Sequence, residues 1–320
     1  MSSAGSRTAT RDEPSEGSVP LLMFASGPVR AYLLLCTTTL CWGANTIFAK
    51  LAVGEVSPMM LTAWRWLGVV LLVWMLAYRR VIRDWDLLRP HLVYLLLMGI
   101  FGFSGFNGLF YAAAHQTTAL NLGIIQGTVP VFVIIGAFIV FRDRVTLLQC
   151  LGIFVTLIGV LFVVTEGDVT RLQQLTFNAG DLMIILACAL YAGYTIWLRE
   201  KPAVSALTWF AMLATAAFIA SVPMAIVEWQ LGFGQYPTPT AWGLLVLIIL
   251  LPSFLAQICF IRGVELLGPG RAGVFVNLVP ILSSIAAVFV LGEAFEWFHA
   301  VALVLVIAGI GVAERFAIRA

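Results

Sequence analysis

The stretch ALNLGIIQGTVPVF at residues 119–132 returns as PGRAGVFVNLVPIL at residues 269–282. A constant shift of 150 residues pairs identical residues without a gap: Gly123 with Gly273, Val129 with Val279, Pro130 with Pro280, and Gly159 with Gly309. A fixed internal shift is the mark of a duplicated structural unit. The sequence therefore predicts two related halves.

The composition indicates that lipid is the main solvent of this chain. Apolar residues make up 61% and charged residues 11%, with a mean hydropathy of +1.01, whereas a soluble domain is about half apolar and a quarter charged. Continuous apolar runs of about 20 residues are long enough to cross a bilayer core, and they lack the alternation of membrane β-strands. We therefore expect an all-α membrane protein with ten transmembrane helices at 31–53, 57–78, 92–114, 117–141, 145–165, 179–198, 203–227, 241–262, 270–292 and 295–314.

The distribution of Lys and Arg predicts the orientation in the membrane, because cytoplasmic loops carry an excess of both. With ten spans, both termini lie on one side. The other side has only Lys50 and Arg171. Fifteen basic residues lie on the side of the termini, which is therefore predicted to be cytoplasmic: Arg7, Arg11, Arg30, Arg79, Arg80, Arg83, Arg89, Arg142, Arg144, Arg199, Lys201, Arg262, Arg271, Arg315 and Arg319.

The same charges predict that the two halves are inverted relative to each other. The cationic loops follow the second and fourth spans in the first half, but the sixth and eighth spans in the second half. Since a five-helix unit has an odd number of spans, its copy must enter the membrane upside down. Inverted repeats are typical of transporters whose substrate path lies near the midplane at the repeat interface. They also provide inward-open and outward-open packings, the basis of alternating access.

Local composition and the repeat together predict the domain organisation. Residues 1–28 are polar and rich in Ser and Gly, and we expect a disordered cytoplasmic tail there. The first five-helix repeat is expected at 29–165, a linker loop at 166–178, and the second, inverted repeat at 179–320. The five cysteines lie within apolar runs and lack CxxC spacing, which indicates packing residues rather than a disulfide or metal framework.

Several motifs carry a family resemblance. Residues 40–50 read LCWGANTIFAK, Ser57-Pro58 opens the second span, and the second half closes with Leu291-Gly292-Glu293. In this order the motifs resemble the EamA-type proteins of the drug/metabolite transporter superfamily, ten-helix carriers made of two inverted five-helix repeats. The resemblance covers nearly all of residues 30–315, and the chain is similar to amino-acid and metabolite exporters such as the YddG type. One departure is Arg142-Asp143-Arg144, where the family more often has a Gly-Glu pair.

Polar and aromatic side chains within the apolar spans are the candidate substrate-binding residues, because polar groups in a membrane tend to face the bundle interior or a water-filled cavity. Amides beside aromatic rings suit a ligand with a zwitterionic head and an apolar body. The alternative is that the amides only hydrogen-bond neighbouring helices. The candidates are Trp42, Asn45, Phe106, Asn107, Tyr111, Gln126, Tyr191, Tyr194, Gln257 and Asn277.

Arg65 is the only basic residue deep within a span, and it completes the candidate set. As a substrate-binding residue it would hold a carboxylate by a bidentate contact. As a structural residue it would cap carbonyls of a neighbouring helix or extend toward water. Both interpretations stay open at the level of sequence.

Two paired prolines are candidate hinges. Pro130 and Pro280 lie at matching places inside spans, where each removes one backbone hydrogen bond and permits a kink. We expect paired bends that reshape during transport. No Asp or Glu lies in the middle of any predicted span, so the sequence shows no carboxylate for ion coupling. Facilitated diffusion stays open, as does coupling through tyrosines, His115 or unwound backbone.

Other functional classes find no support. The three histidines lie far apart and no carboxylate pair shares a span, so neither an enzyme nor a cofactor or metal site is expected. Basic residues spread over short loops follow from topology and do not indicate nucleic-acid binding. The sequence predicts a multi-pass inner-membrane carrier of small amphipathic metabolites, foremost aromatic or neutral amino acids. Export rather than import is what the resemblance implies. The alternative is a drug, metabolite or nucleotide-sugar carrier of the same fold; a monomer is compatible with the sequence.

Overall fold

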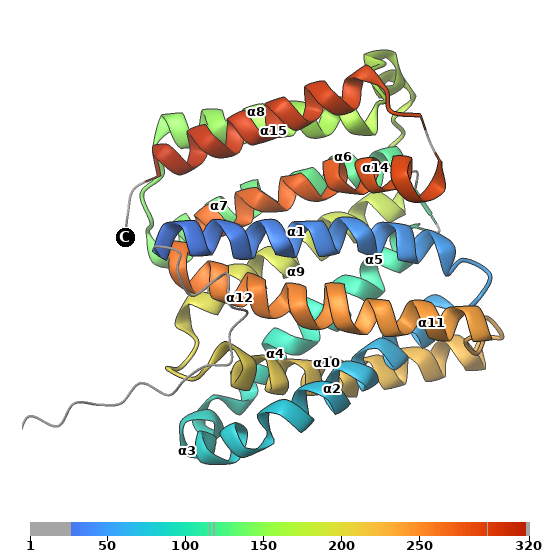
Figure 1. The fold of residues 1–320 in the computed structure, drawn as a ribbon, viewed down its shortest axis with the longest axis vertical. Coiled ribbons are helices and arrows are strands. Elements are labelled where there is room, and N and C mark those ends of the chain that lie inside the picture. Colours follow the sequence, from blue (N-terminus) through green and yellow to red (C-terminus); the bar gives the residue numbers. More distant parts are fainter. Residues whose placement is uncertain (1–26, 115, 118, 293, 318–320) are drawn as a thin grey trace, which may run out of the picture.

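A computed structural model describes residues 27–114, 116–117, 119–292 and 294–317. Every regular element in these ranges is a helix, and nine helices there are long and apolar enough to cross a membrane. A shorter apolar helix, α7 (Val129–Phe141), follows α6 (Ala119–Gly127), and together they make the remaining crossing. The prediction of an all-α membrane protein with ten crossings is confirmed (Figure 1).

The other crossings follow the chain in simple order, three of them built from several helical segments. The third crossing consists of α3 (Trp85–Leu88), η2 (Arg89–His91), α4 (Leu92–Gly99), η3 (Ile100–Gly105) and α5 (Phe106–Ala114). The eighth crossing consists of α11 (Pro239–Ile248), η6 (Ile249–Leu255) and α12 (Ala256–Leu267). The ninth crossing consists of α13 (Pro269–Val274), η7 (Phe275–Asn277) and α14 (Leu278–Leu291). The continuous ones are α1 (Gly27–Leu51), α2 (Pro58–Arg83), α8 (Leu147–Val164), α9 (Ala179–Trp197) with η5 (Leu198–Glu200), α10 (Ala206–Gln230) and α15 (Trp297–Arg315).

Some predicted boundaries need correction. Helix α2 continues to Arg83 rather than ending at 78, and α12 continues to Leu267 rather than ending at 262. Long basic side chains allow this, because their apolar stems stay in the bilayer while the charged groups reach water. The predicted linker at 166–178 contains a short 3-10 helix, η4 (Val169–Gln174). Of the predicted tail, residues 1–26 lie outside the described residues, and Gly27 already belongs to α1.

Helix termini are set by local signals and by distant acidic groups. Asn178 and Asp181 form a capping box at the start of α9. Ser57 precedes α2 without capping it through its own side chain. The Glu228 carboxylate at the end of α10 instead accepts hydrogen bonds from the Ser57 hydroxyl at 2.6 Å and the Met59 amide at 3.0 Å. This contact ties the two halves together, and it satisfies amides that a helix start leaves without partners.

The turn after α7 adopts the same backbone conformation as the turn after α14. Arg142 has a φ of 58°, and Gly292, at the matching place 150 residues later, has a φ of 72°. Left-handed conformations favour glycine and are strained for other residues. Because Arg142 nevertheless adopts the left-handed conformation that Gly292 adopts, the departure from the family pattern at Arg142-Asp143-Arg144 leaves the turn geometry unchanged.

Two crossings contain a π-helical segment where the sequence predicts plain α-helix. These segments are η3 in the third crossing and η6 in the eighth, and their first residues are 149 positions apart, close to the repeat shift. Pro252 inside η6 has no N–H, which interrupts the α-helical ladder there. π-helical segments inside α-helices are frequent at functional sites.

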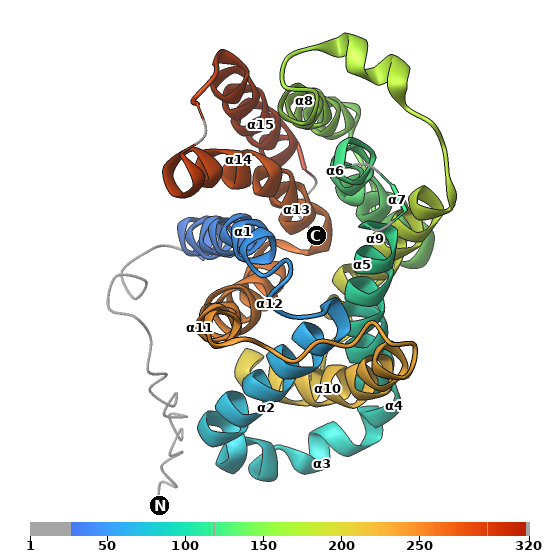
Figure 2. The same ribbon diagram turned by 90° about the vertical axis from the view of Figure 1, so that its right-hand side faces the viewer.

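The helices surround a common centre, as Figures 1 and 2 show. Helices α8 and α15 lie side by side along one edge of the bundle, and α2 packs on α10 at the opposite edge. The start of α1 and the end of α15 lie at the same end of the bundle (Figure 1). The buried core runs through α9, whose Ile184 and Cys188 are fully enclosed.

Candidate functional site

A cavity of about 240 Å³ lies at the centre of the bundle, between the two repeats. Its wall comes from α1, α2 and the third crossing of the first repeat, from α9 and α12 of the second, and from the segments around the paired prolines. Nine of the eleven residues predicted to bind substrate line it: Trp42, Asn45, Arg65, Phe106, Asn107, Gln126, Tyr191, Gln257 and Asn277. Residues from sites far apart in sequence thus converge on one chamber.

The two other predicted residues do not contribute to the described wall. The side chain of Tyr111 lies outside the described part of the chain. Tyr194 is buried but lies behind the wall, where its ring packs 5.0 Å from Phe103 and 5.7 Å from Tyr191. The prediction that Tyr194 faces the cavity is therefore not met by the geometry, because Gly102 lets η3 close over its ring.

The structure adds wall residues to those predicted to bind substrate. Thr46, Trp66, Phe103 and Phe110 also line the cavity. Trp66 stacks on Phe103 with ring centroids 4.9 Å apart. An aromatic residue inside an apolar run carries no sequence signal that separates a wall position from a core position. Trp66 was therefore not predicted, although its neighbour Arg65 was.

Aromatic rings form a continuous apolar part of the wall. The Tyr191 ring lies 5.4 Å from Phe106 and 6.0 Å from Trp42, and Phe106 lies 5.9 Å from Phe110. These separations are within the range of favourable edge and stacked contacts. The rings provide a rigid surface for the apolar body of a ligand.

Amide groups form the polar part of the wall. Asn277 donates through Nδ2 to the Thr156 hydroxyl at 2.7 Å, which orients its amide. Within the described residues, Asn277 Oδ1, Gln257 Oε1 and the Tyr191 hydroxyl have no hydrogen-bond partner. Buried polar atoms rarely stay unpaired, and each such atom calls for an explanation such as water or a ligand. These three buried oxygens belong to residues of the cavity wall.

Arg65 brings the positive charge of the cavity. Of the described residues that line it, Arg65 is the only cation, and none is acidic. The side chain is 6% exposed, its Nε donates to the Ser253 hydroxyl at 2.6 Å, and its guanidinium carbon lies 5.4 Å from the centre of the Trp66 ring. These contacts hold the guanidinium against the wall. The two interpretations of Arg65 are thus compatible, since it both bonds a neighbouring helix and lines the cavity.

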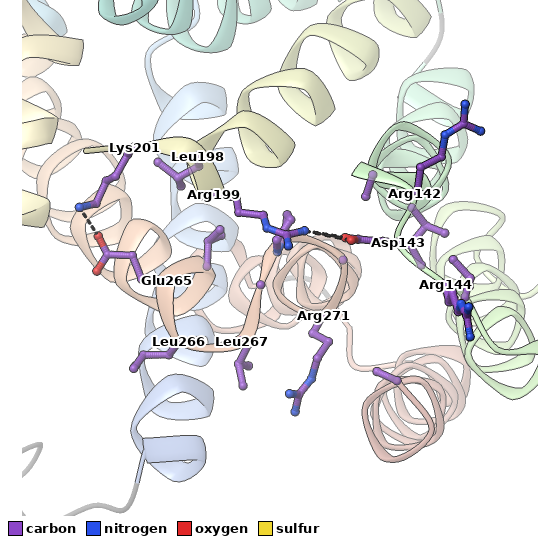
Figure 3. Close-up of a pocket in the computed structure, with 18 of the residues that line it drawn as sticks. Arg142, Asp143, Arg144, Leu198, Arg199, Lys201, Glu265, Leu266, Leu267 and Arg271 are labelled. Atoms are coloured by element: carbon purple, nitrogen blue, oxygen red, sulfur yellow. Dashed lines mark hydrogen bonds and ion pairs between the residues drawn. The ribbon is translucent and has the colours of Figure 1, made fainter. Parts of the chain in front are cut away.

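A second, larger cleft of about 750 Å³ lies at the end of the bundle where α15 ends, and it shares no lining residue with the central cavity. Figure 3 shows its charged wall, where Arg199 reaches Asp143 at 2.9 Å and Lys201 reaches Glu265 at 2.9 Å. The Arg199–Asp143 pair is more than a third exposed on the arginine side, and such pairs contribute little free energy, whereas the Lys201 side chain is only 9% exposed.

A helix contact separates the cleft from the cavity. Helix α13 packs on α7, and a Cβ built on Gly273 would lie 3.3 Å from Val133. Val133 lies between the cavity-lining Val129 and the cleft-lining Ile134 on the same helix. The contact between α13 and α7 thus lies between the cavity and the cleft.

The paired prolines lie beside local breaks in their helices. The fourth crossing is interrupted at Thr128, and Pro130 falls in the first turn of α7. The ninth crossing passes through η7, and Pro280 falls in the first turn of α14 and lines the cavity. The breaks correspond between the repeats; movement at these positions stays a prediction. Among the described residues no group of three or more His, Cys, Asp or Glu could hold a metal ion.

A ten-crossing helical bundle around a central cavity is an architecture typical of membrane transporters. The EamA-like transporter family matches the chain twice, at residues 29–165 and 178–314. The chain therefore belongs to the EamA-like transporter family, within the drug/metabolite transporter superfamily.

Relatives of known sequence agree with this assignment. The uncharacterized transporter YyaM of Bacillus subtilis is 28% identical over 289 residues, covering 87% of this chain and 92% of its own length. An uncharacterized transporter of Archaeoglobus fulgidus is 27% identical over 289 residues, covering 88% and 96%. A crystal structure with 18% identity superimposes with a TM-score of 0.72 over 90% of this chain and 98% of its own, which shows the shared fold.

Proposed function

We propose that this transporter exports small amphipathic metabolites, foremost aromatic or neutral amino acids, across a bacterial-type inner membrane by alternating access. The observation that carries the proposal is the central cavity, in which aromatic rings, unpaired amide oxygens and one arginine converge from both repeats. A zwitterionic head pairs with the arginine and the amides, and an apolar side chain packs on the rings. Substrate binding is thus assigned to the cavity wall.

The distribution of charge supports an orientation in the membrane. Lys and Arg gather on the side of the termini by fifteen to two, so that side is assigned to the cytoplasm. The contact between α7 and α13 lies between the cavity and this side, as expected for an outward-facing or occluded state. Export, rather than import, is carried over from the resemblance to YddG-type exporters.

The alternative cargo, a nucleotide sugar, would bring two phosphate groups into the cavity. The described wall offers Arg65 as its one cation, and phosphates are recognised by clusters of Arg and Lys or by helix N-termini. A single arginine beside amides matches a single carboxylate better. Drugs and other apolar metabolites remain alternative substrates for a transporter of this fold.

Counterflow into proteoliposomes tests the cargo. Vesicles loaded with unlabelled Phe, Trp, Leu, Met or Thr are diluted into the labelled amino acid, with and without an imposed pH gradient. Exchange without a gradient supports an uncoupled amino-acid carrier, whereas exchange only under a gradient indicates proton coupling. Absence of exchange for every amino acid under both conditions rejects this cargo and leaves the fold and family intact.

A further inference from the structure

The π-helical segment η6 contains a buried serine whose hydroxyl has a fixed direction. Pro252 has no N–H, so the carbonyl of Ile248, four residues earlier, lacks its α-helical donor. The Ser253 hydroxyl donates to this carbonyl at 2.6 Å. A serine hydroxyl has one proton, and here that proton is committed to the backbone.

Because the Ser253 hydroxyl proton is donated to the Ile248 carbonyl, the Ser253 oxygen can only accept hydrogen bonds from other groups. Arg65 Nε lies 2.6 Å from this oxygen and donates to it, and Ser253 is fully buried. The hydrogen bonds therefore run in one direction, from Arg65 through Ser253 to the backbone of the eighth crossing. Because a guanidinium is planar, fixing Nε while Trp66 flanks the group also fixes the plane of the two terminal nitrogens.

The same segment holds a second wall residue. Trp42 Nε1 donates to the carbonyl of Pro252 at 3.2 Å, and the Trp42 ring lies 6.0 Å from Tyr191 in the cavity wall. The break in the helix thus frees backbone and side-chain acceptors that orient the arginine and one of the rings. Ser253 itself does not line the cavity.

We propose that Ser253 is a positioning residue that sets the direction of the Arg65 guanidinium and thereby the preference of the cavity for a carboxylate. The inference rests on the proposed function, in that it assigns the central cavity as the substrate site. It does not depend on the cargo being an amino acid. Any ligand with an apolar body and one carboxylate meets the same two groups.

The other repeat supplies a matched control. Ser104 in η3 is 1% exposed and donates to the carbonyl of Ala217 at 2.6 Å. Ser104 and Ser253 therefore occupy corresponding π-helical segments and each makes a buried hydrogen bond to backbone. Only Ser253 also accepts from Arg65, so Ser104→Ala removes a similar bond without changing the arginine.

The test measures binding of 3-phenylpropionate and of its amide to purified protein in detergent by titration calorimetry. These two probes differ in the carboxylate alone. Wild type is expected to bind the acid about tenfold more tightly than the amide, because a charge-assisted contact is roughly twice as strong as a neutral one. Ser253→Ala is expected to reduce this ratio to about twofold by weakening the acid, while Ser253→Thr and Ser104→Ala keep the ratio of wild type.

The proposal is overturned if Ser253→Ala keeps the ratio of wild type, if Ser104→Ala lowers it equally, or if wild type does not prefer the acid. Should Ser253→Ala fail to give a monodisperse protein, Ser253→Cys replaces it, since a thiol keeps the volume but is a weak acceptor. Failure of amino-acid counterflow, together with an acid preference that Ser253→Ala lowers, would reject the cargo and keep the role of Ser253.

Discussion

Helices α8 and α15 approach each other backbone to backbone, and this contact makes a strong prediction about Gly309. A Cβ at Gly309 would lie 2.6 Å from the carbonyl oxygen of Gly152 and 2.8 Å from the amide nitrogen of Thr156. Ordinary contacts of a carbon atom need about 3.5 Å, so the helices would have to separate by about 1 Å. Neither neighbour is a flexible side chain that could move aside. Overpacking of this kind costs about 1–3 kcal/mol, and we expect Gly309→Ala to lower the free energy of unfolding by that amount.

Gly311 provides the control on the same helix. A Cβ at Gly311 would meet nothing within 4 Å, and this residue is exposed on the face away from α8. Gly311→Ala is expected to be neutral or to stabilise by up to about 1 kcal/mol, because alanine favours the helix over glycine. The two variants make the same chemical change two residues apart.

Thermal unfolding of the purified variants in one detergent measures the difference. We expect a lower unfolding midpoint for Gly309→Ala and an unchanged or higher midpoint for Gly311→Ala. Equal midpoints for the two variants would refute the backbone contact between α8 and α15.

Three further predictions concern other parts of the molecule. Removing the cap at the first turn of α2 by Glu228→Ala is expected to lower the free energy of unfolding by about 1 kcal/mol, read from the thermal midpoint; an unchanged midpoint contradicts the cap. Pro130→Ala and Pro280→Ala are each expected to slow counterflow exchange with little change in half-saturation, and unchanged rates in both variants would exclude the hinges. The hydrogen bond from Arg171 lowers the pKa of Glu166 below its ordinary value of 4.5, so this contribution to stability is present above pH 4.5 and is lost as the pH falls through the lowered pKa. Glu166→Gln is therefore expected to flatten the acid-side decline of the unfolding midpoint, and an identical decline would show that the pair contributes nothing.

The crossings and their number could be predicted from sequence because each apolar run must be long enough for the bilayer, a constraint that needs no knowledge of packing. The π-helical segments η3 and η6 could not be predicted from sequence. Whether a carbonyl bonds four or five residues ahead depends on acceptors and donors from other helices, such as Arg65 reaching Ser253. Pro252 was the one local signal for a break, and it does not distinguish a kink from a π-helical segment.

The cavity wall was partly predictable for a related reason. Polar residues in lipid need a partner or a cavity, so Asn45, Gln126, Gln257 and Asn277 were detectable as single residues. Aromatic residues pack equally well in a core, a wall or lipid. Tyr194, which lies behind the wall, therefore could not be distinguished from Tyr191 in the wall without the tertiary structure.

The most direct test of the central claim compares counterflow by cavity variants with counterflow by a surface variant. Gln257→Leu and Asn277→Leu replace amides of the cavity wall with apolar groups of similar size, and Gln230→Leu makes the same kind of change at an exposed position at the end of α10. If the cavity binds the cargo, exchange of labelled Phe or Leu is expected to fall about tenfold in each cavity variant and to stay at the wild-type rate in Gln230→Leu. Wild-type exchange that persists in both cavity variants would contradict the assignment of the central cavity as the substrate site.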